Sequence, residues 1–394
     1  MKRRSFVYKS ALATTALTGF PLSATGSTKK PLETLNMGII GTGARGAGMT
    51  YLINEIDHMQ VVGCCDSLPF RLEEGLKAVN GTAKGYRDYR KLLDNKDVDA
   101  VLIATPFNTH SRIAMDALDA GKHVYCEKTL AKGYFGIENL VKKTQASNQV
   151  FQTGHQYHSS RLYAHIIELI NDGKIGTPTA FECYWNRNGN WRKPVPDPAM
   201  ERAINWRMYR EFSGGLVAEL CSHQLDFVNW ALGSVPEKVV GFGGVDYWKD
   251  GRETYDNVHL TYSYPKGVRA KFTSLTTNAM EGYKIKCIGD KGTIIIGPTN
   301  AWFHPEGSYK KEMGQADGVA GATTNWEQGK GMPINVSHMD PSKQALVDFQ
   351  TSIVNNTEPI SNCTTGARTA MCVQMGLDAM HGEKVVSWNQ ELAV

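Results

Sequence analysis

His223 and Lys128 are the first side chains whose chemistry stands out. A histidine can take up a hydroxyl proton near neutral pH, which the oxidation of a secondary alcohol requires. Lys128 follows Glu127 at the end of an apolar stretch, where its charge could stabilise a developing alkoxide. Glu219 lies four residues before His223, so on a helix the two side chains share one face, one turn apart. This pattern predicts a site for acid–base chemistry on an alcohol.

Two different roles for Glu219 and His223 stay open. A single histidine on a helix is often a packed or surface residue rather than a base. The spacing E-x-x-x-H is also typical of metal ligands, with His155, His158 and His165 as conceivable partners. No ligand set with characteristic spacing completes such a site, so we expect no metal. The eight cysteines contain no C-x-x-C pair and lie mostly in apolar segments, which predicts buried thiols.

A glycine-rich turn stands between an apolar run that begins at Leu35 and an amphipathic stretch. In the pattern G-x-G-x-x-G, glycine allows a tight turn, close approach of the backbone to a pyrophosphate, and contact between helix and strand. The start of the following helix then faces the phosphates. We therefore predict a dinucleotide site that includes Gly41, Thr42, Gly43, Ala44, Arg45 and Gly46.

Asp66 ends a second apolar run, 20 residues after the last glycine of the turn. An acid at this place accepts hydrogen bonds from the adenosine ribose hydroxyls and repels a 2′-phosphate. No arginine follows directly, which favours NAD over NADP, although Arg71 lies one turn further on. The alternative is that Asp66 only caps the next helix.

Polar residues follow two further apolar runs, Ala100 to Ala104 and His123 to Cys126. Ligands of open α/β sheets bind at the carboxyl ends of the strands. A solvated strand end would also be polar, and this alternative stays open. We expect this edge to complete the cofactor site with Thr105, Pro106, Asn108, His110, Glu127 and Lys128.

The segment from Phe181 to Arg210 combines three tryptophans with several asparagines and arginines. Aromatic faces pack on the C–H side of a sugar ring, while amide and guanidinium groups bond its hydroxyls. The tryptophans could equally seal a domain core or a subunit contact. The candidate substrate-binding residues are His155, Tyr157, Trp185, Arg187, Trp191, Trp206, Arg207 and His223.

Together, the stretches GTGARG, VVGCCD, ATPFNTH and CEK resemble the family of glucose-fructose oxidoreductases and inositol dehydrogenases, called Gfo/Idh/MocA. The resemblance covers almost the whole chain after the N-terminal segment. It implies a Rossmann domain, then an α/β domain whose open sheet forms the floor of a sugar site and often an oligomer interface. It also implies that Lys128, Glu219 and His223 are the catalytic set, with no metal, and that the chain forms a homo-oligomer.

Three positions depart from the patterns that this resemblance brings. Thr129 stands where proline is usual, which bears on how the peptide is held beside the nicotinamide. Glu219 stands where aspartate is usual, so its role is open. The exported glycoside hydrolases of the superfamily resemble one another in a Tyr-x-x-His motif, whereas Leu220 occupies the tyrosine position here.

The elements that must position these residues alternate between strand and helix in the first half, which predicts a doubly wound parallel sheet. Alternating stretches from Lys238 to Ile296 predict antiparallel strands. The expected fold class is therefore α/β, with a Rossmann domain at residues 35–155 and an α+β domain with a large, mostly antiparallel open sheet at 156–394. Residues 299–339 are interpreted as a long insertion that covers the site or forms an interface arm. Final helices are expected at 343–355 and 365–381, packed back on the first half.

Residues 1–26 combine Lys2, Arg3 and Arg4 with a short apolar run and small residues, as an export signal does. The paired arginines resemble a twin-arginine signal. A membrane anchor is the alternative, but the run has about a dozen residues where a span needs roughly 20. Removal of the segment would lower the formal net charge from +4 to 0, so charge supports no nucleic-acid or membrane partner. We expect a periplasmic protein.

These observations predict an exported NAD-dependent enzyme that oxidises a secondary hydroxyl of a sugar or glycoside, with a 3-keto-glycoside as the specific product. His223 would be the base and Lys128 its electrostatic support. Because no ready pool of NAD exists outside the cytoplasm, the cofactor is expected to be tightly bound. Two alternatives are a glycoside hydrolase that works by transient oxidation and elimination, and a non-catalytic sugar- or NAD-binding protein.

Overall fold

The computed structural model describes residues 34–308, 310–313, 324–327 and 331–390. The predicted export signal at 1–26 lies outside the described residues, as does part of the predicted insertion at 299–339. Within the described ranges, no helix is both long and apolar enough to cross a membrane.

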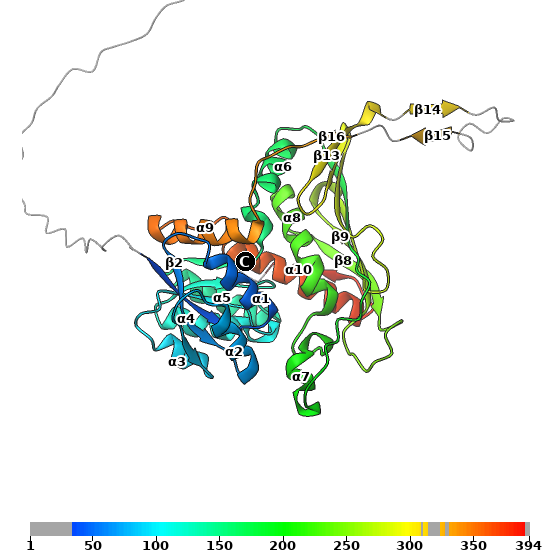
Figure 1. The fold of residues 1–394 in the computed structure, drawn as a ribbon. Helices are drawn as coiled ribbons and strands as arrows, with labels where there is room; N and C mark the ends of the chain where they lie inside the picture. Colours follow the sequence, from blue (N-terminus) through cyan, green and yellow to red (C-terminus); the bar gives the residue numbers. More distant parts are fainter. Residues whose placement is uncertain (1–33, 309, 314–323, 328–330, 391–394) are drawn as a thin grey trace, which may run out of the picture. The chain divides into compact units, whose positions relative to one another are not determined.

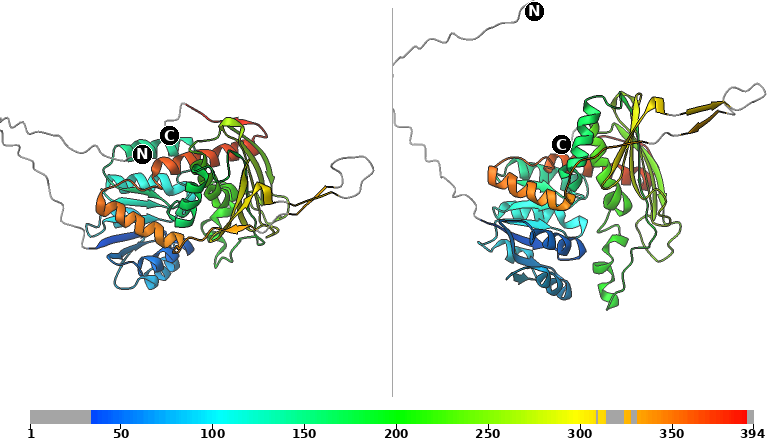
Figure 2. Two further views of the ribbon diagram at one scale, coloured as in Figure 1. Left: turned by 90° about the horizontal axis from the view of Figure 1, so that it is seen from above. Right: turned by 45° about the horizontal axis from the view of Figure 1, so that its top comes forward.

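The first half of the described chain forms a six-stranded parallel sheet with helices on both faces (Figures 1 and 2). The strand order is β3-β2-β1-β4-β5-β6, so the order reverses between β1 and β4, where doubly wound folds bind their ligands. The strands are β1 Leu35–Ile40, β2 Met59–Cys65, β3 Lys84–Tyr86, β4 Ala100–Ile103, β5 His123–Cys126 and β6 Phe151–Thr153. The helices are α1 Ala44–Ile53, α2 Pro69–Ala78, α3 Tyr89–Leu93, α4 His110–Asp119 and α5 Tyr134–Gln145.

A second sheet of nine strands follows, in the order β16-β13-β12-β11-β7-β10-β9-β8-β17. Among these neighbours only β7 and β10 run parallel. The predicted fold class, a parallel Rossmann sheet with a mostly antiparallel open sheet, is confirmed. The strands are β7 Pro178–Trp185, β8 Lys238–Gly244, β9 Asn257–Ser263, β10 Arg269–Leu275, β11 Tyr283–Gly289, β12 Gly292–Ile296, β13 Ala301–Pro305, β16 Met332–Pro333 and β17 Val386–Ser387.

Helices α6 Arg161–Asn171 and α8 Ser222–Leu232 cover one face of the second sheet (Figure 1). Their apolar residues, such as Ile166 and Phe227, share one core with sheet residues such as Phe272. A short helix, α7 Glu201–Ile204, lies in the long segment between β7 and α8.

The last two helices connect the two halves of the molecule. Helix α9, Pro341–Asn355, contributes Phe349 to the Rossmann core, where its ring lies 5.7 Å from that of Tyr125. Helix α10, Cys363–His381, places Met371 in a Rossmann core and Val373 in the core of the second sheet. Because one helix serves both cores, the two sheets cannot separate without exposing buried apolar surface.

Residues 299–339 differ in part from the predicted insertion. Strand β13 joins the second sheet because Ala301 and Phe303 are buried in its core, and β16 pairs with β13. The remaining strands, β14 Lys310–Met313 and β15 Thr324–Glu327, form a separate two-stranded sheet. Whether this part covers the site or forms an interface stays a prediction.

Candidate active site

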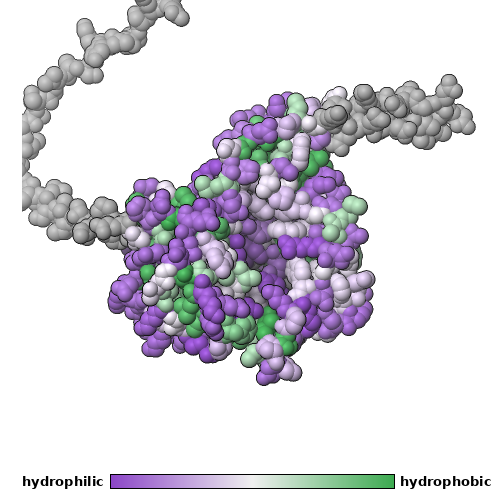
Figure 3. Space-filling model, viewed as in Figure 1, coloured by the Kyte–Doolittle hydropathy of each residue, from purple (hydrophilic) through white to green (hydrophobic). Residues whose placement is uncertain are grey.

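A cavity of about 750 Å³ lies at the carboxyl ends of β1, β2 and β4. It is the place that the strand order predicts for a ligand. Figure 3 shows the face that carries α2 and α7 hollowed, with mostly hydrophilic residues around the hollow. Of the predicted cofactor residues, the cavity is lined by Gly41, Gly43, Asp66, Thr105, Pro106 and Asn108.

Two glycines of the turn admit no side chain. A Cβ on Gly46 would lie 1.9 Å from the carbonyl oxygen of Gly41, because helix and strand meet there. A Cβ on Gly41 would lie 2.6 Å from the carbonyl oxygen of Ala104, and its φ of +91° favours glycine. The turn therefore has the close backbone packing that a dinucleotide-binding loop requires.

The Asp66 carboxylate is fixed by the backbone around it. One oxygen accepts from the Thr42 N–H at 3.0 Å, and the other accepts from the Leu68 N–H at 2.9 Å. Each carboxylate oxygen retains a further lone pair. The acid therefore reaches the cavity in a fixed orientation, as recognition of the ribose hydroxyls requires.

Several predicted cofactor residues lie elsewhere. Ala44 lines a neighbouring cavity with Phe70 and Arg71, whereas Thr42 is buried and bonds the Arg71 carbonyl oxygen at 2.7 Å. His110 is buried, with ring nitrogens 2.9 Å from the Thr129 carbonyl oxygen and 3.0 Å from that of Thr105. Burial holds the pKa of His110 below its usual value, although both carbonyls raise it. His110 therefore stabilises the backbone at Thr105 and Thr129 and does not line the cavity itself.

Arg45 turns from the glycine turn toward the end of β5. Its Nε lies 2.6 Å from Glu127 Oε1, and its Nη1 donates to Ser342 Oγ at 3.1 Å. The Glu127 carboxylate also accepts from the Lys128 N–H at 3.2 Å. Arg45 and Glu127 thus join the cofactor turn to the peptide that carries Lys128.

The cavity has further walls that sequence reasoning missed. Residues after β3, one residue of α4 and residues of the α7 region complete it, namely Arg87, Tyr89, Arg90, Arg112, Arg202 and Phe212. The Asn108 N–H donates to the Phe212 carbonyl oxygen at 3.2 Å, which ties the two sides together. The residues after β3 could have been predicted from the sequence, because β3 ends at the same edge of the sheet as its neighbour β2. The α7 side could not, because it approaches from a distant part of the chain.

Lys128 and Glu219 meet at the junction of the two halves. The Lys128 ammonium donates to the Glu219 carbonyl oxygen at 2.9 Å, and the Glu219 carboxylate accepts from Arg207 Nε at 2.8 Å. Burial lowers the pKa of Lys128 below its usual value, against the attraction of Glu219. Burial alone would raise the pKa of Glu219, but Arg207 and Lys128 hold it below its usual value. The Glu219 carboxylate is therefore ionised and binds the Arg207 guanidinium, while the Glu219 carbonyl oxygen holds the Lys128 ammonium.

The helix around Glu219 differs from the regular turn expected between Glu219 and His223. Residues Val217–Cys221 form a π-helix that leads directly into α8. Such turns are frequent at functional sites because they shift side chains out of the regular helical phase. Here the Glu219 carboxylate binds Arg207, and His223 faces a group of rings.

His223 is buried among aromatic rings. Its ring lies 5.3 Å from Trp185, 5.5 Å from Tyr157 and 5.9 Å from His155, measured between centroids. Its Nδ1 is buried without a hydrogen-bond partner. Burial, reinforced by Lys128 and His155, holds the pKa of His223 well below its usual value. The imidazole is therefore neutral at neutral pH and able to accept a proton.

The remaining predicted substrate residues divide into two groups. The Arg187 guanidinium lies 5.4 Å from the Trp185 ring and 5.8 Å from the Trp191 ring, next to the His223 cluster. Trp206 instead lines the 750 Å³ cavity beside the glycine turn, and Arg207 binds Glu219.

Sequence reasoning missed two further tyrosines of the His223 cluster. The Tyr157 ring stacks on Tyr163 at 4.5 Å and lies 5.4 Å from Tyr283. The Tyr163 hydroxyl donates to that of Tyr283 at 2.9 Å. Tyr283 is directly opposite Trp185 in the sheet, a pairing that only the register reveals.

The described ranges contain neither a metal-binding group nor a disulfide. No group of three or more described histidine, cysteine or acidic side chains is placed to hold a metal ion. All eight cysteines are buried free thiols, as predicted.

The profile of the Gfo/Idh/MocA family described as "Oxidoreductase family, NAD-binding Rossmann fold" matches residues 35–155. That described as "Oxidoreductase family, C-terminal alpha/beta domain" matches residues 167–387. The chain belongs to the Gfo/Idh/MocA oxidoreductase family. The first profile describes an NAD-binding fold, and the residues of the cavity at the glycine turn fit that cofactor through the glycine contacts and the fixed Asp66 carboxylate.

Known Gfo/Idh/MocA proteins resemble the chain in sequence and fold. Myo-inositol 2-dehydrogenase of Thermotoga maritima is 26% identical over 267 residues, which cover 66% of this chain and 75% of that protein. The 2,7-anhydro-N-acetylneuraminate hydratase of Mediterraneibacter gnavus is 31% identical over 214 residues, 54% of this chain and 53% of that protein. The structure of levoglucosan dehydrogenase with NADH and levoglucosan aligns with a TM-score of 0.73 over 91% of this chain and 100% of that one, at 17% identity.

Proposed function

We propose that this protein is an exported NAD-dependent oxidoreductase that oxidises a secondary hydroxyl of a sugar or glycoside, with a 3-keto-glycoside as the specific product. The observation that carries the proposal is that Lys128, at the sheet edge of the NAD site, binds the Glu219 carbonyl oxygen, four residues before a neutral His223 that lies among aromatic rings. NAD⁺, when bound, supplies the hydride acceptor of such a reaction.

The residues of the site have separable tasks. His223 removes the hydroxyl proton, because burial keeps its imidazole neutral at working pH. The Lys128 ammonium, held by the Glu219 carbonyl oxygen, stabilises the oxygen that loses the proton. Arg207 fixes Glu219 and so keeps the partner of Lys128 in place.

A sugar-like substrate fits the walls around His223. Trp185 and Tyr157 supply aromatic rings next to His223, and the Arg187 guanidinium over the Trp185 ring supplies hydrogen-bond donors. The names of relatives point the same way, since they act on myo-inositol and levoglucosan. An exported enzyme meets glycosides rather than phosphorylated sugars, which is why we propose a glycoside.

The proposed location implies retention of NAD. If residues 1–26 direct export after folding, NAD must be loaded before transport and held through many turnovers. The α7 side of the cavity supports retention, because Arg202, Trp206 and Phe212 line the same cavity as the glycine turn. N-terminal sequencing of the protein from periplasmic extracts should give a start near residue 27. A start at Met1, or recovery from the cytoplasm alone, contradicts export.

We also propose a homo-oligomer, formed through the outer face of the second sheet. One row of directly paired residues crosses this face from exposed Val240 to exposed Trp302, which pairs in turn with Pro333 of β16. Charged pairs such as Glu182 and Lys286 lie in the middle of the row. Sedimentation should show a multiple of the chain mass, and a monomer at micromolar concentration contradicts this part.

A panel of glucosides, galactosides and free sugars, added to purified protein with its NAD, tests the activity. The proposal predicts a rise in absorbance at 340 nm together with a keto-sugar seen by mass spectrometry. No reduction of bound or added NAD with any member of the panel contradicts it.

One observation favours a second candidate, glycoside cleavage by transient oxidation and elimination. Tyr157, from a different part of the chain, places its ring 5.5 Å from that of His223, beside which the local sequence has no tyrosine. A relative named a hydratase adds a precedent for a reaction without net oxidation. Release of an aglycone without net NADH would establish this candidate.

A further inference from the structure

His155 and His223 form a buried pair in which each ring has a nitrogen without a partner. Their rings meet edge to face, with centroids 5.9 Å apart and planes at 81°. His223 Nδ1 and His155 Nε2 are both buried and make no hydrogen bond. A buried polar atom without a partner is costly, and native proteins keep few of them without a functional reason. The pairing of two such atoms in adjacent rings suggests a shared task.

His155 begins a line of hydrogen-bonding groups that leads away from the substrate. Its Nδ1 lies 3.2 Å from Thr153 Oγ1, which lies 2.7 Å from Ser361 Oγ. The approach of helix α10 fixes Thr153, since a Cβ on Gly366 would come within 2.4 Å of its methyl group. The line is therefore confined between β6 and the segment before α10.

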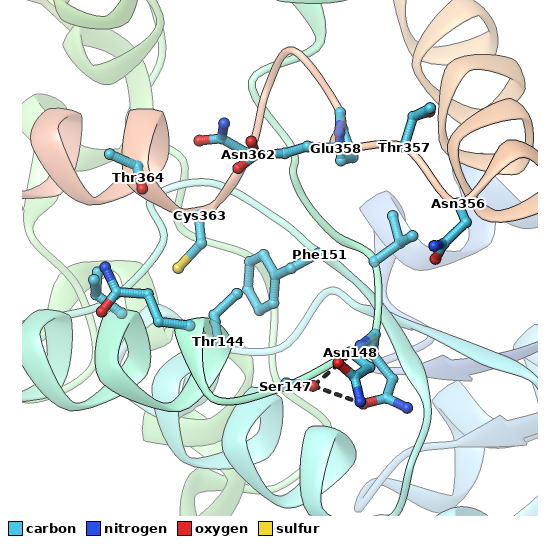
Figure 4. A pocket seen from close by; sticks show the side chains of 15 residues that line it. Thr144, Ser147, Asn148, Phe151, Asn356, Thr357, Glu358, Asn362, Cys363 and Thr364 are labelled. Atoms are coloured by element: carbon cyan, nitrogen blue, oxygen red, sulfur yellow. Dashed lines mark hydrogen bonds between the residues drawn. The ribbon is translucent and has the colours of Figure 1, made fainter. Parts of the chain in front are cut away.

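Ser361 lies next to a second cavity. This cavity, of about 250 Å³, is lined by the end of α5, the start of β6 and the segment that joins α9 to α10 (Figure 4). Asn362 and Pro359, the close neighbours of Ser361, belong to its wall. It lies at the amino end of β6, whereas His155 follows the carboxyl end. Ser361 itself pairs with the backbone of Thr153, the last residue of β6, so the line ends on the segment whose neighbouring residues form the wall of this cavity.

The charges around the two histidines differ. Lys128, Arg45 and Arg187 all disfavour a positive charge on His223. His155 also feels Lys128 and His158, but the Asp226 carboxylate and Glu127 favour its protonated form. Asp226 is itself held by His158 at 2.9 Å and by the Thr369 hydroxyl at 3.1 Å. A proton that reaches His223 is therefore better placed on His155.

We propose that His155, Thr153 and Ser361 form a proton relay that carries away the proton removed from the substrate. The inference rests on the proposed role of His223 as base. As the substrate O–H bond breaks, its proton binds His223 Nε2, and the proton on His223 Nδ1 passes through one water molecule to His155 Nε2. The proton on His155 Nδ1 passes to Thr153 Oγ1, the Thr153 hydroxyl proton passes to Ser361 Oγ, and the Ser361 hydroxyl proton passes to solvent water in the adjacent cavity. Each group gives up one proton as it gains another, so only one proton is moved in total.

Matched substitutions at Thr153 test the relay, because valine keeps the shape and serine keeps the hydroxyl. T153V should lower kcat roughly tenfold and raise the solvent isotope effect on kcat, at unchanged KM and NAD content. T153S should retain the wild-type values. H155Q should lower kcat by about 10- to 100-fold with the same signature. Wild-type kcat and isotope effects in both T153V and H155Q would overturn the relay.

A readout without turnover separates failure of the relay from failure of the proposed function. Nitrogen-15 NMR of the histidines should show His155 neutral with its proton on Nδ1, and a shift of that signal in T153V and in the more distant variant S361A. A proton on Nε2, or no response to either variant, overturns the relay even in an active enzyme. A wild-type protein that reduces no NAD with any sugar, yet shows these signals, counts against the proposed function alone.

Discussion

The NAD site and the His223 cluster are assembled in opposite ways. The NAD site takes most of its walls from one stretch of chain, and its key carboxylate is held by backbone N–H groups. The His223 cluster takes Lys128 from the first half and its rings from the segment after β6, from α8 and from the second sheet. One imidazole nitrogen each of His223 and His155 is left without a partner. A rigid backbone site suits a cofactor that stays, whereas unpaired side-chain atoms suit a substrate that must react and leave.

Loss of His223 should have the largest effect, and it should affect turnover without affecting the NAD site. H223A should lower kcat by about 10²- to 10⁴-fold, because the reaction loses its base, while NAD stays bound. Steady-state kinetics and mass spectrometry of the purified protein measure both. H165A is the matched control, since His165 is an exposed histidine on α6 whose loss should change neither. Equal losses of turnover and sugar binding in H223A would favour a non-catalytic binding protein.

A methyl group on the glycine turn should affect the other region. G46A must push the Gly41 carbonyl away and is expected to destabilise the protein by about 1–3 kcal/mol and to release NAD. G48A lies on the same helix and meets nothing within 4 Å, so it should be neutral or slightly stabilising. Thermal unfolding and NAD content check the pair. Retention of NAD by G46A would show that the turn does not hold the cofactor.

Trp206 and Trp185 lie in different regions, so their substitution tests whether the NAD site and the His223 cluster act separately. W206A should weaken NAD retention by about three- to thirtyfold with little change in sugar KM, because Trp206 lines the NAD cavity. W185A should do the reverse, because Trp185 lies against His223. The dissociation rate of NAD and the KM for the sugar, measured for both variants, test these two expectations. Identical profiles for both variants would mean that the two regions are not separate.

Low pH should destabilise the folded protein through its buried histidines. Burial lowers the pKa of His223, His155 and His110, so each stays neutral in the fold at pH values where the unfolded chain binds a proton. The free energy of unfolding should therefore fall as the pH drops below about 6.5, the ordinary histidine value. Urea titrations between pH 5 and 8 measure this. The value of kcat/KM should stay flat from about pH 6.5 to 8, because the His223 base is already neutral there, and a titration of the base near pH 7 would contradict the assignment.

The contrast also accounts for what the sequence could reveal. The apolar runs of β1, β2, β4 and β5, the glycine turn and Asp66 are local patterns, and the structure has them where they were predicted. The place of Trp206 could not be predicted, because it depends on how the α7 segment returns to the NAD site. Tyr283 was missed for a similar reason, since only strand register brings it opposite Trp185. The π-helix at Glu219 has no simple sequence signal. Predictions failed where residues distant in the chain meet.

The transfer of an isotope tests the central claim most directly. Natively purified protein, with the NAD it carries, would be mixed with a glycoside deuterated at the carbon that bears the reacting hydroxyl, and the cofactor then extracted for mass spectrometry. We expect one deuterium on the nicotinamide ring in the wild type and almost none in H223A over the same time. Purification without NAD, or deuterium found only in water, would contradict it.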